Sequence, residues 1–361
     1  MRLMLKTIKI LVIVLVAVLV VAVGGALAMR FYRQHAAAGE FTIEKPAGIR
    51  ESGYVRIGGI DQWVQIRGRH RDNPVLLCLH GGPGATWLPV TRLFRGWEQE
   101  FTVVLWDQRG AGKTLKVSGP AIASTMTIAR MVEDGVELAE HLRMRLGKEK
   151  IILLGHSFGS VVGIRMALAR PDLFHAFVGT GQVGDLPRSL TLEYARLQEQ
   201  ATAAHDGKTL AALAQIGPPP FKNLQQVATY FEQAAKYQPA ADQAAIVLMK
   251  QSLLAPPPDF SLADEFNRFR GFASVPPWGL YDELLNTRLR DSGIDLKIPV
   301  IVIQGGKDTV TPLAHAEDYV GQLDAPGKAL TVIPDAGHYA VWTHADAFLN
   351  ELRQRVRPLA R

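Results

Sequence analysis

Five short apolar runs, separated by stretches with helical periodicity, constrain the fold of this chain more than any other feature. The runs are Val75–Leu79, Thr102–Trp106, Ile151–Leu154, Pro299–Ile303 and Leu330–Ile333. Because they are continuous rather than alternating, they are typical of strands that are buried on both faces. Such strands belong to a mostly parallel sheet with helices on both faces. The sequence therefore predicts an α/β protein.

Three further segments complete the predicted organisation. Residues 34–52 are interpreted as a linker with a first strand at Phe41-Thr42-Ile43. Residues 54–66 alternate apolar and polar side chains around Gly58-Gly59, which predicts a hairpin. Between residues 185 and 291 the strand pattern stops, and proline clusters break a region rich in Ala, Gln and Leu. We predict that this region is a helical lid inserted between two parts of the sheet domain, residues 53–184 and 292–361.

The first 33 residues are predicted to form a membrane anchor or a signal peptide. Ile10–Met29 is a run of twenty uncharged residues, and a helix of that length spans about 30 Å, enough to cross a bilayer core. Basic residues before the run favour a cytoplasmic N-terminus, with the rest of the chain on the periplasmic or extracellular side. The run is long for a signal peptide, which favours an uncleaved anchor. The pattern Ala26-Leu27-Ala28 leaves open cleavage near Ala28 and secretion, and a buried core helix is the third interpretation.

The net charge of +6 originates in this N-terminal segment. Five of the 40 Lys and Arg residues precede the first acid, Glu40, and without them 35 basic residues face 34 acidic ones. The remaining chain is nearly neutral, so we expect no nucleic acid among its partners. The single cysteine, Cys78, excludes an internal disulfide framework and a cysteine-rich zinc site.

A candidate nucleophile lies in Gly155-His-Ser-Phe-Gly159, after one predicted strand and before a helix-forming stretch. A sharp turn between a strand and a helix lifts the Ser157 hydroxyl above the sheet, and flanking glycines tolerate the strained backbone. The alternative is a glycine-rich turn without a catalytic role. We interpret Ser157 as the nucleophile of a hydrolase.

A serine nucleophile needs a base, and the base needs a carboxylate to orient it. In this topology both partners follow late strands, in the order serine, acid, histidine. Asp308 follows the fourth apolar run and His338 follows the fifth, which predicts a catalytic triad of Ser157, Asp308 and His338. Asp335 is the rival acid, although its place on the same tight turn as His338 suits capping better.

The loop His80-Gly-Gly-Pro-Gly84 follows the first apolar run and is a candidate oxyanion site. Acyl transfer needs two N–H groups directed at the developing negative charge, and a glycine backbone can approach closely enough to supply one. We assign one donor to Phe158, the residue after the serine, and the other to Gly82, with Gly81 as a close alternative. A tight turn without a catalytic part is the plainer interpretation.

The segment Asp107-Gln-Arg-Gly-Ala-Gly-Lys-Thr114 ends like a phosphate-binding loop. That motif requires a glycine where Asp107 stands, and a carboxylate there would repel phosphate. We predict instead that Asp107 and Arg109 brace the turn beside the oxyanion loop.

Taken together, these residues resemble the α/β-hydrolase fold and, within it, the proline iminopeptidase family of serine peptidases. The similar segments are His80–Gly84, Asp107–Gly112, Gly155–Ser160, Gly306–Asp308 and Gly337-His338. The resemblance implies an enzyme that removes an N-terminal residue, typically proline, from a peptide without a metal or other cofactor. The sequence departs from the family at the elbow, where His156 and Phe158 replace the usual Gly and Trp. Its insertion also shows no clear match to the segments whose glutamates hold the substrate's amino group.

Three functions compete at this point. The leading one is an exported, membrane-anchored aminopeptidase that acts on small peptides through an acyl-enzyme. It needs a lid carboxylate to pair with the substrate's ammonium, because a buried unpaired cation is costly. The second is an esterase or lipase-like acyl hydrolase with the same triad and an apolar lid face. The third, a catalytically inactive binding protein, is disfavoured because all three triad residues are present.

Several lid residues are candidates for substrate binding. We expect Glu193, Glu232 and Trp278 to contact the substrate. The other candidate acids are Asp264, Glu265, Asp282 and Glu283. The other aromatic residues, Phe266, Phe269, Phe272 and Tyr281, fit the core of the lid better than a substrate wall.

Overall fold

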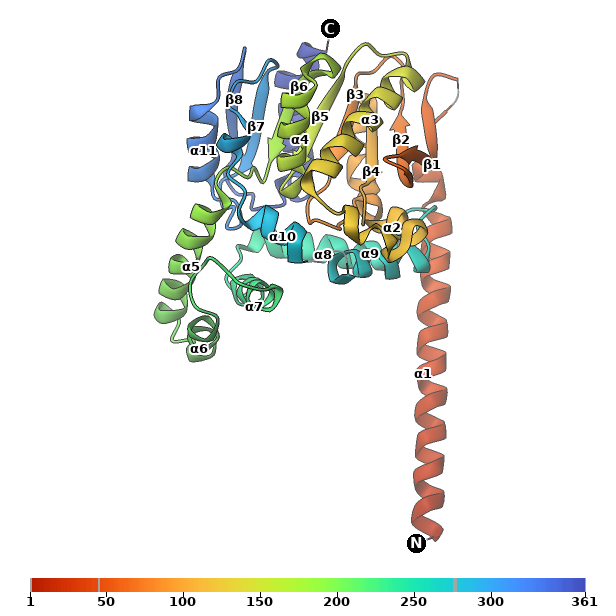
Figure 1. Cartoon of the computed structure of the whole chain (residues 1–361). Coiled ribbons are helices and arrows are strands. Elements are labelled where there is room, and N and C mark those ends of the chain that lie inside the picture. The colour runs from red at the N-terminus through yellow and green to blue at the C-terminus, as the bar shows by residue number, and fades with distance from the viewer. Residues whose placement is uncertain (1, 45, 275–277, 361) are drawn as a thin grey trace.

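A central eight-stranded sheet organises the computed structural model, which describes residues 2–44, 46–274 and 278–360 (Figure 1). The strands are β1 Ile49–Ile57, β2 Ile60–Gly68, β3 Val75–Leu79, β4 Thr102–Asp107, β5 Ile151–His156, β6 Phe174–Thr180, β7 Val300–Gly305 and β8 Lys328–Ile333. They lie in the order β1-β2-β4-β3-β5-β6-β7-β8. The pairs β1–β2 and β2–β4 are antiparallel, and all the other pairs are parallel. The predicted mostly parallel sheet is confirmed.

Helices surround this sheet, and six more form the described part of the segment between β6 and β7. Around the sheet lie α2 Gly112–Ser118, α3 Ile128–Leu146, α4 Phe158–Ala169, α11 Leu313–Gln322, α12 Ala340–Thr343 and α13 Ala345–Glu351. The segment between β6 and β7 holds α5 Leu186–Ala203, α6 Gly207–Ile216, α7 Leu224–Ala235, α8 Ala240–Leu254, α9 Leu262–Ser274 and α10 Trp278–Leu285. We call these six helices the insertion; they lie together below the sheet domain in the view of Figure 1.

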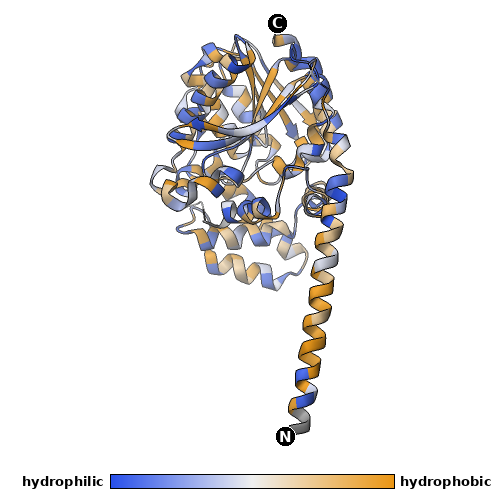
Figure 2. Cartoon of the chain, turned by 90° about the vertical axis from the view of Figure 1, so that its right-hand side faces the viewer, coloured by the Kyte–Doolittle hydropathy of each residue, from blue (hydrophilic) through white to orange (hydrophobic). Residues whose placement is uncertain are grey.

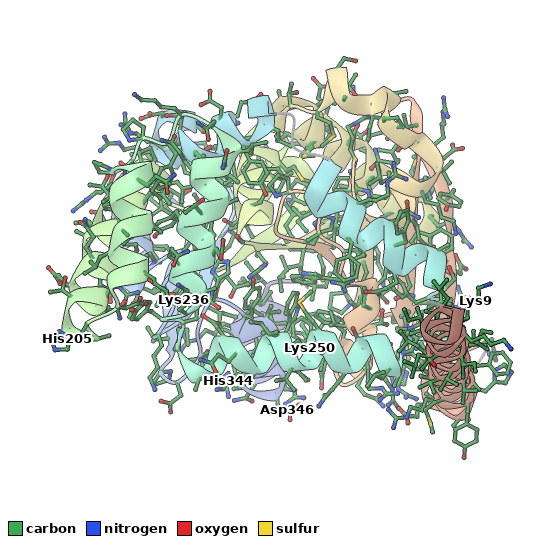
Figure 3. The ribbon with its side chains drawn as sticks, turned by 90° about the horizontal axis from the view of Figure 1, so that it is seen from below. Lys9, His205, Lys236, Lys250, His344 and Asp346 are labelled. Atoms are coloured by element: carbon green, nitrogen blue, oxygen red, sulfur yellow. The ribbon has the colours of Figure 1, made fainter. Side chains whose placement is uncertain are left out.

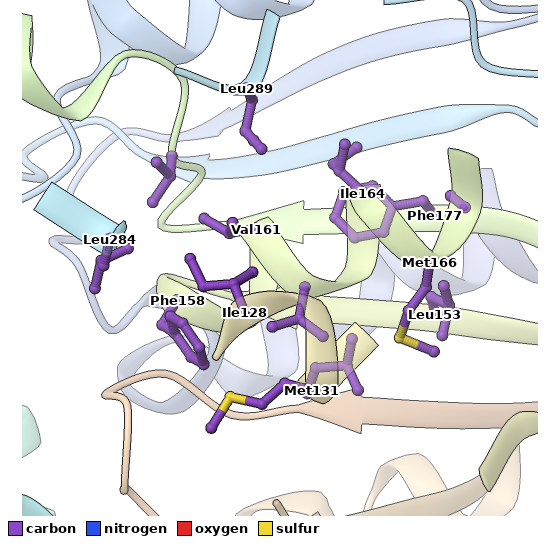
Figure 4. Packing of buried hydrophobic residues seen from close by; sticks show 14 of the residues in the cluster. Ile128, Met131, Leu153, Phe158, Val161, Ile164, Met166, Phe177, Leu284 and Leu289 are labelled. Carbon is purple, nitrogen blue, oxygen red and sulfur yellow. The ribbon is translucent and has the colours of Figure 1, made fainter. Parts of the chain in front are cut away.

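The core has two parts, one on each face of the sheet. Successive strand residues point to opposite faces, so Leu77 and Val104 belong to one apolar cluster while Leu76 and Val103 belong to the other. In the first cluster, α3 and α4 pack their apolar side chains on the strands (Figure 4). This two-sided burial explains why the strand sequences are continuous apolar runs.

The predicted hairpin is confirmed as β1 and β2. Their two-residue turn is Gly58-Gly59, with φ values of 56° and 76°. A turn of this kind requires positive φ at both central positions, which glycine adopts without a steric cost.

The predicted strand at Phe41-Thr42-Ile43 is wrong. A 3₁₀ turn, Ala38–Phe41, occupies its start, and the first strand of the sheet is β1. The Phe41 carbonyl accepts a hydrogen bond of 2.9 Å from the guanidinium of Arg67, and its ring is buried beside that guanidinium. The Arg67 side chain of β2 therefore donates to the carbonyl group that would accept a backbone hydrogen bond if this segment were a strand.

The helix α1, Arg2–Ala36, extends away from the rest of the molecule, and Figure 2 shows its long hydrophobic stretch. Residues Leu5–Ala36 are long and apolar enough to cross a membrane, and the most apolar part of this stretch is not buried in the protein. The interpretation of the apolar run as a buried core helix is therefore wrong.

Candidate active site

Ser157 lies on a strained turn between β5 and α4. Its backbone has φ 53° and ψ −120°, a conformation that is costly for a residue with a side chain. The neighbouring glycines are required by packing: a Cβ added at Gly159 would lie 2.1 Å from the carbonyl oxygen of Leu79, and one at Gly155 would lie 2.5 Å from that of Gly159. The predicted sequence of strand, sharp turn and helix is therefore present, and Ser157 remains partly exposed.

His338 and Asp308 are brought together by the loops after β8 and β7. The His338 Nδ1 atom lies 2.9 Å from Oδ2 and 3.2 Å from Oδ1 of Asp308, and both side chains are buried. A carboxylate only accepts hydrogen bonds, so Nδ1 carries the proton and donates it. This tautomer leaves Nε2 of His338 with a free lone pair, as a general base requires.

Asp308 is held as a carboxylate by several donors. It accepts hydrogen bonds from the backbone N–H groups of Val310 and Thr311, each at 2.8 Å, and from the Thr311 hydroxyl at 2.8 Å. Burial alone would raise the pKa of Asp308, but the charge and hydrogen bond of His338 and the bonds from Thr311 outweigh it and lower the pKa. Asp308 is therefore an ionised partner for the imidazole.

The rival acid, Asp335, lies elsewhere. Its side chain is 81% exposed and pairs with Nζ of Lys307 at 2.7 Å. The structure thus brings Asp308, and not Asp335, into contact with His338.

The protonation of His338 is set by opposing effects. Burial alone would lower its pKa, but the charge and hydrogen bond of Asp308, with the charge of Asp242, outweigh burial and raise the pKa above the ordinary value of 6.5. His156 behaves in the opposite way, because burial and the nearby His338 lower the pKa of His156 to about 3. Neutral His156 donates from Nε2 to the carbonyl oxygen of His338 at 3.0 Å, which fixes the loop that carries His338.

The loop at His80–Gly84 lies against the serine turn. A Cβ added at Gly81 would lie 3.1 Å from Cβ of Ser157 and 2.9 Å from Nδ1 of His156, so only glycine permits this approach. His80 donates from Nδ1 to the Gly81 carbonyl at 2.8 Å and accepts at Nε2 from the Gln108 N–H at 3.2 Å. Burial lowers the pKa of His80 to about 4, so its ring is neutral in this arrangement. Gly81, Gly82 and Phe158 all line the same cavity as Ser157.

Asp107 and Arg109 brace this region from the next loop, as predicted. Asp107 accepts a hydrogen bond from the N–H of Lys113 at 2.7 Å, which closes the turn into α2. Arg109 forms a buried ion pair with Asp134 of α3, with Nε 2.8 Å from Oδ2. Arg130 and Gln62 also donate to Asp134, which has no exposed surface.

We expect Asp134→Ala to destabilise the protein by about 3–5 kcal/mol, because removing one member of a buried pair leaves the other charge uncompensated. The measurement is urea unfolding followed by circular dichroism. Asp172→Ala is the matched control, since the side chain of Asp172 is 59% exposed in its ion pair with Arg170. Because solvent screens such a pair, this variant should stay close to the wild type in stability. Equal losses in the two variants would contradict the bracing role.

A cavity of about 600 Å³ contains Ser157 and His338 in its wall. The insertion supplies much of the wall, mainly through apolar side chains. These include Leu186, Leu224, Val227, Met249, Tyr281 and Leu284. Arg268 of α9 is the charged residue that the insertion contributes, and no Asp or Glu lines the cavity among the residues that the structure describes.

Of the three expected substrate contacts, the two acids are not brought to this cavity. Glu193 on α5 pairs with Arg196, its Oε2 lying 2.6 Å from Nη2, and Glu232 on α7 is exposed; neither lines the cavity. Trp278 begins α10, but its side chain, like that of Phe272, lies outside the described part of the chain.

The other candidate acids are engaged in structural contacts. Asp264 is buried and pairs with Lys113 and Lys116, and Glu265 pairs with Arg268. Asp282 accepts a hydrogen bond from Asn286, and Glu283 accepts one from the N–H of Ile128 at the start of α3. None of the four lines the cavity. Of the aromatic candidates, Tyr281 does line it, whereas Phe266 and Phe269 are exposed, so their assignment to the core of the lid is wrong.

Two buried polar residues near the site had not been singled out in the sequence. Gln304, at the end of β7, donates to Oδ2 of Asp308 at 2.9 Å and to the carbonyl of Thr311 at 2.6 Å. A glutamine inside an otherwise apolar run just before Asp308 was the available signal. Asp242 on α8 is also buried, with Oδ1 3.3 Å from the N–H of Tyr339, and nothing in the local sequence indicated this long-range contact.

The comparisons with known proteins agree with this architecture. Residues 74–345 match the α/β hydrolase fold family. The chain is 29% identical over 322 residues to the probable aminopeptidase YbaC of Bacillus subtilis, covering 83% of this chain and 94% of that protein. It is 24% identical over 310 residues to a proline iminopeptidase of Saccharolobus solfataricus, covering 84% and 91%. A solved proline iminopeptidase of Mycobacterium smegmatis superposes with a TM-score of 0.61 at 21% identity, covering 86% and 99%. The chain belongs to the α/β-hydrolase fold family, and within it resembles the proline iminopeptidases.

Proposed function

We propose that this protein is a serine hydrolase in which Ser157 is the nucleophile, His338 the general base and Asp308 the residue that orients it. One observation carries this assignment: the Asp308–His338 hydrogen bond and the strained Ser157 turn meet at one cavity. A serine, a histidine and an acid arranged in this way are the requirements of nucleophilic acyl transfer.

In the proposed reaction, Nε2 of His338 takes the hydroxyl proton of Ser157 as the serine oxygen attacks the substrate's carbonyl carbon. The N–H groups of Phe158 and Gly82, or of Gly81 in place of Gly82, stabilise the oxyanion. The protonated His338 then donates to the leaving amine or alcohol, and the acyl-enzyme remains. Water activated by His338 releases the acid and restores Ser157.

For the substrate, we propose first a small peptide with a free N-terminus, from which the enzyme releases one residue. The names of the Bacillus subtilis and Saccharolobus solfataricus relatives support this aminopeptidase function. Glu193 is the first candidate for holding the ammonium, because it is half-buried and its charge interacts with that of Asp308. It does not line the cavity in this structure, so it would have to leave its ion pair with Arg196 to reach the substrate. Burial raises the pKa of Glu193 and Arg196 opposes this effect.

The second candidate function is hydrolysis of a carboxylic ester. It is favoured by the lining of the cavity, which is mostly apolar and contains Arg268 but no described carboxylate. Such a wall suits an acyl chain, or a substrate that carries its own negative charge, better than an ammonium group.

A substrate comparison separates the two functions. An aminopeptidase should cleave free prolyl and alanyl arylamides about 10²–10³ times better in kcat/KM than their N-acetylated forms, the amount that losing one partner of a desolvated charge pair costs. The assay uses the full chain in detergent micelles, with Glu193→Gln as a test of the ammonium site and Glu199→Gln, on the same helix, as its control. If blocked arylamides and acyl esters turn over as well as free-amine substrates, the ester function is correct.

The pH dependence tests the role of His338. The base works only when neutral, so kcat/KM should fall as the pH drops through the pKa of His338, and the midpoint should lie above 6.5 because Asp308 and Asp242 raise that pKa. The measurement is kcat/KM from pH 5 to 8 with an ester substrate that does not itself titrate. A midpoint well below 6.5 would contradict the assignment of His338 as an Asp308-paired base.

We also propose that α1 remains attached as a membrane anchor, with the catalytic domain on the extracytoplasmic side. Its length and composition support a membrane span, and the basic residues before Ile10 support the orientation. Membrane fractionation with protease treatment of intact cells and spheroplasts tests both statements. Release of a soluble chain that begins after Ala28 would show a signal peptide instead.

A further inference from the structure

The helix α9 has the reverse of the usual polarity for a helix at a protein surface. Of its charged and amide side chains, Asp264, Glu265, Asn267 and Arg268 are buried and Arg270 is half-buried. Its exposed described residues are all apolar: Leu262 is 54% exposed, Phe266 66% and Phe269 55%, together with Ala263. A helix that faces water normally places its apolar stripe inward. The outer stripe at positions 262, 266 and 269 therefore indicates an apolar environment outside the protein.

The rotation of α9 is fixed by the contacts of its inner face. Asp264 lies 3.3 Å from Nζ of Lys113 and 3.1 Å from Nζ of Lys116, both of α2. Arg268 pairs with Glu265 and reaches the wall of the cavity. Turning α9 to bury its phenylalanines would break these ion pairs and move Arg268 out of the cavity. The outward apolar stripe is thus a property of the folded domain.

The neighbouring helix α8 continues this surface. Ile246, Val247 and Leu254 are 43%, 51% and 53% exposed, and they recur on the outer side of the helix with Lys250. Its one acid, Asp242, is buried against the loop of His338. The exposed described residues of α8 and α9 therefore include a cation but no carboxylate, which suits a surface with anionic lipid.

The helix α1 reaches the molecule at this same surface. Arg30 donates to the carbonyl of Phe260 at 3.0 Å, and Gln34 donates to that of Pro257 at 2.7 Å, so the end of α1 holds the connection between α8 and α9. Seen from below, α8 and α9 lie on the near face and α1 runs out beside them (Figure 3). The apolar run of α1 ends at Met29, one residue before Arg30. The start of α9 therefore lies level with the end of the hydrophobic span.

We propose that the outer surface of α8 and α9, which we call the lid face (Ile246, Val247, Lys250, Leu254, Leu262, Phe266 and Phe269), docks on the lipid bilayer from which α1 emerges. This inference rests on the proposed membrane span of α1. Burying the three α9 side chains at the interface follows the physics of an interfacial amphipathic helix. Since Arg268 on the inner side of α9 lines the cavity, the same helix separates the lipid surface from the active site.

Spin labels on the full chain test this inference. The chain is reconstituted in vesicles of phosphatidylcholine and phosphatidylglycerol, with one label attached at Phe266→Cys. Native Cys78 remains in place, because it is buried and burial raises the pKa of its thiol. We expect the label at 266 to collide more with oxygen, which concentrates in lipid, than with a water-soluble nickel chelate. A label at Met144→Cys on α3, which is 79% exposed, is the aqueous control and should show the reverse.

A label at Val16→Cys separates this inference from the membrane span itself. If residue 16 shows the lipid signature and residue 266 behaves like residue 144, α1 spans the bilayer but the lid face does not dock, and the inference is wrong. If residue 16 also behaves as in water, the span and the docking both fail. Spin–spin broadening between labels at 266 would reveal a second copy on this surface and would overturn lipid as its partner. In the supporting case, Phe269→Asp should lose the lipid signature at 266 while the signature at 16 stays unchanged.

Discussion

Ser157→Ala should lower kcat by about 10⁴–10⁶-fold, the range for removing the nucleophile of a serine hydrolase triad. Ser157 lines the cavity, and among the described residues its hydroxyl makes no hydrogen bond to the rest of the protein that would stabilise the fold. The backbone strain at φ 53° is unchanged by alanine, which has the same Cβ. We therefore expect loss of turnover without loss of stability.

The measurement combines kcat on the best substrate of the screen with thermal unfolding of the same sample. Ser252→Ala is the control, because Ser252 on α8 does not line the cavity and its hydroxyl donates to a backbone carbonyl, that of Met249, at 2.6 Å. A fluorophosphonate probe should label the wild type and the control at Ser157 but leave Ser157→Ala unlabelled. A variant at Ser157 that keeps a tenth of the activity would exclude this residue as the nucleophile.

The sheet and the three residues of the proposed triad were predictable because their signals are local. A strand that is buried on both faces has a continuous apolar sequence. A catalytic residue in the loop that follows such a strand lies at the carboxyl end of the sheet. Asp308 and His338 follow β7 and β8 in this way. β6 was missed because His175 and Gly179 interrupt its apolar pattern, although its residues are otherwise buried.

The insertion was predictable as helical but not in its details. The direction in which each helix faces depends on partners far away in the sequence, such as the pairing of Asp264 with Lys113 or of Asp242 with Tyr339. Residue type alone indicates Glu193 and Glu232 as candidates, and residue type carries no information about helix rotation. Composition likewise assigned Phe266 and Phe269 to a core, because exposed aromatic stripes are rare on proteins that face only water.

Asp308→Asn should lower kcat by about 10²–10⁴-fold, and it provides the sharpest test of how His338 is held. Asparagine has nearly the same shape, so the hydrogen bonds from Val310 and Thr311 can still be accepted by its oxygen. Its amide has no charge and also donates, which favours the wrong tautomer of His338. The acidic limb of kcat/KM should also move to lower pH, since the charge that raises the pKa of His338 is gone.

Asp335→Asn is the matched control, with the same chemical change three residues from His338. Its ion pair with Lys307 is exposed and screened by solvent, so kcat and the acidic limb should stay close to those of the wild type. The two effects together distinguish an orienting carboxylate from a residue that merely supports the fold, because loss of stability alone would not shift the pH profile. If Asp335→Asn is the more damaging variant, or if Asp308→Asn leaves the acidic limb in place, Asp308 is not the acid of the triad.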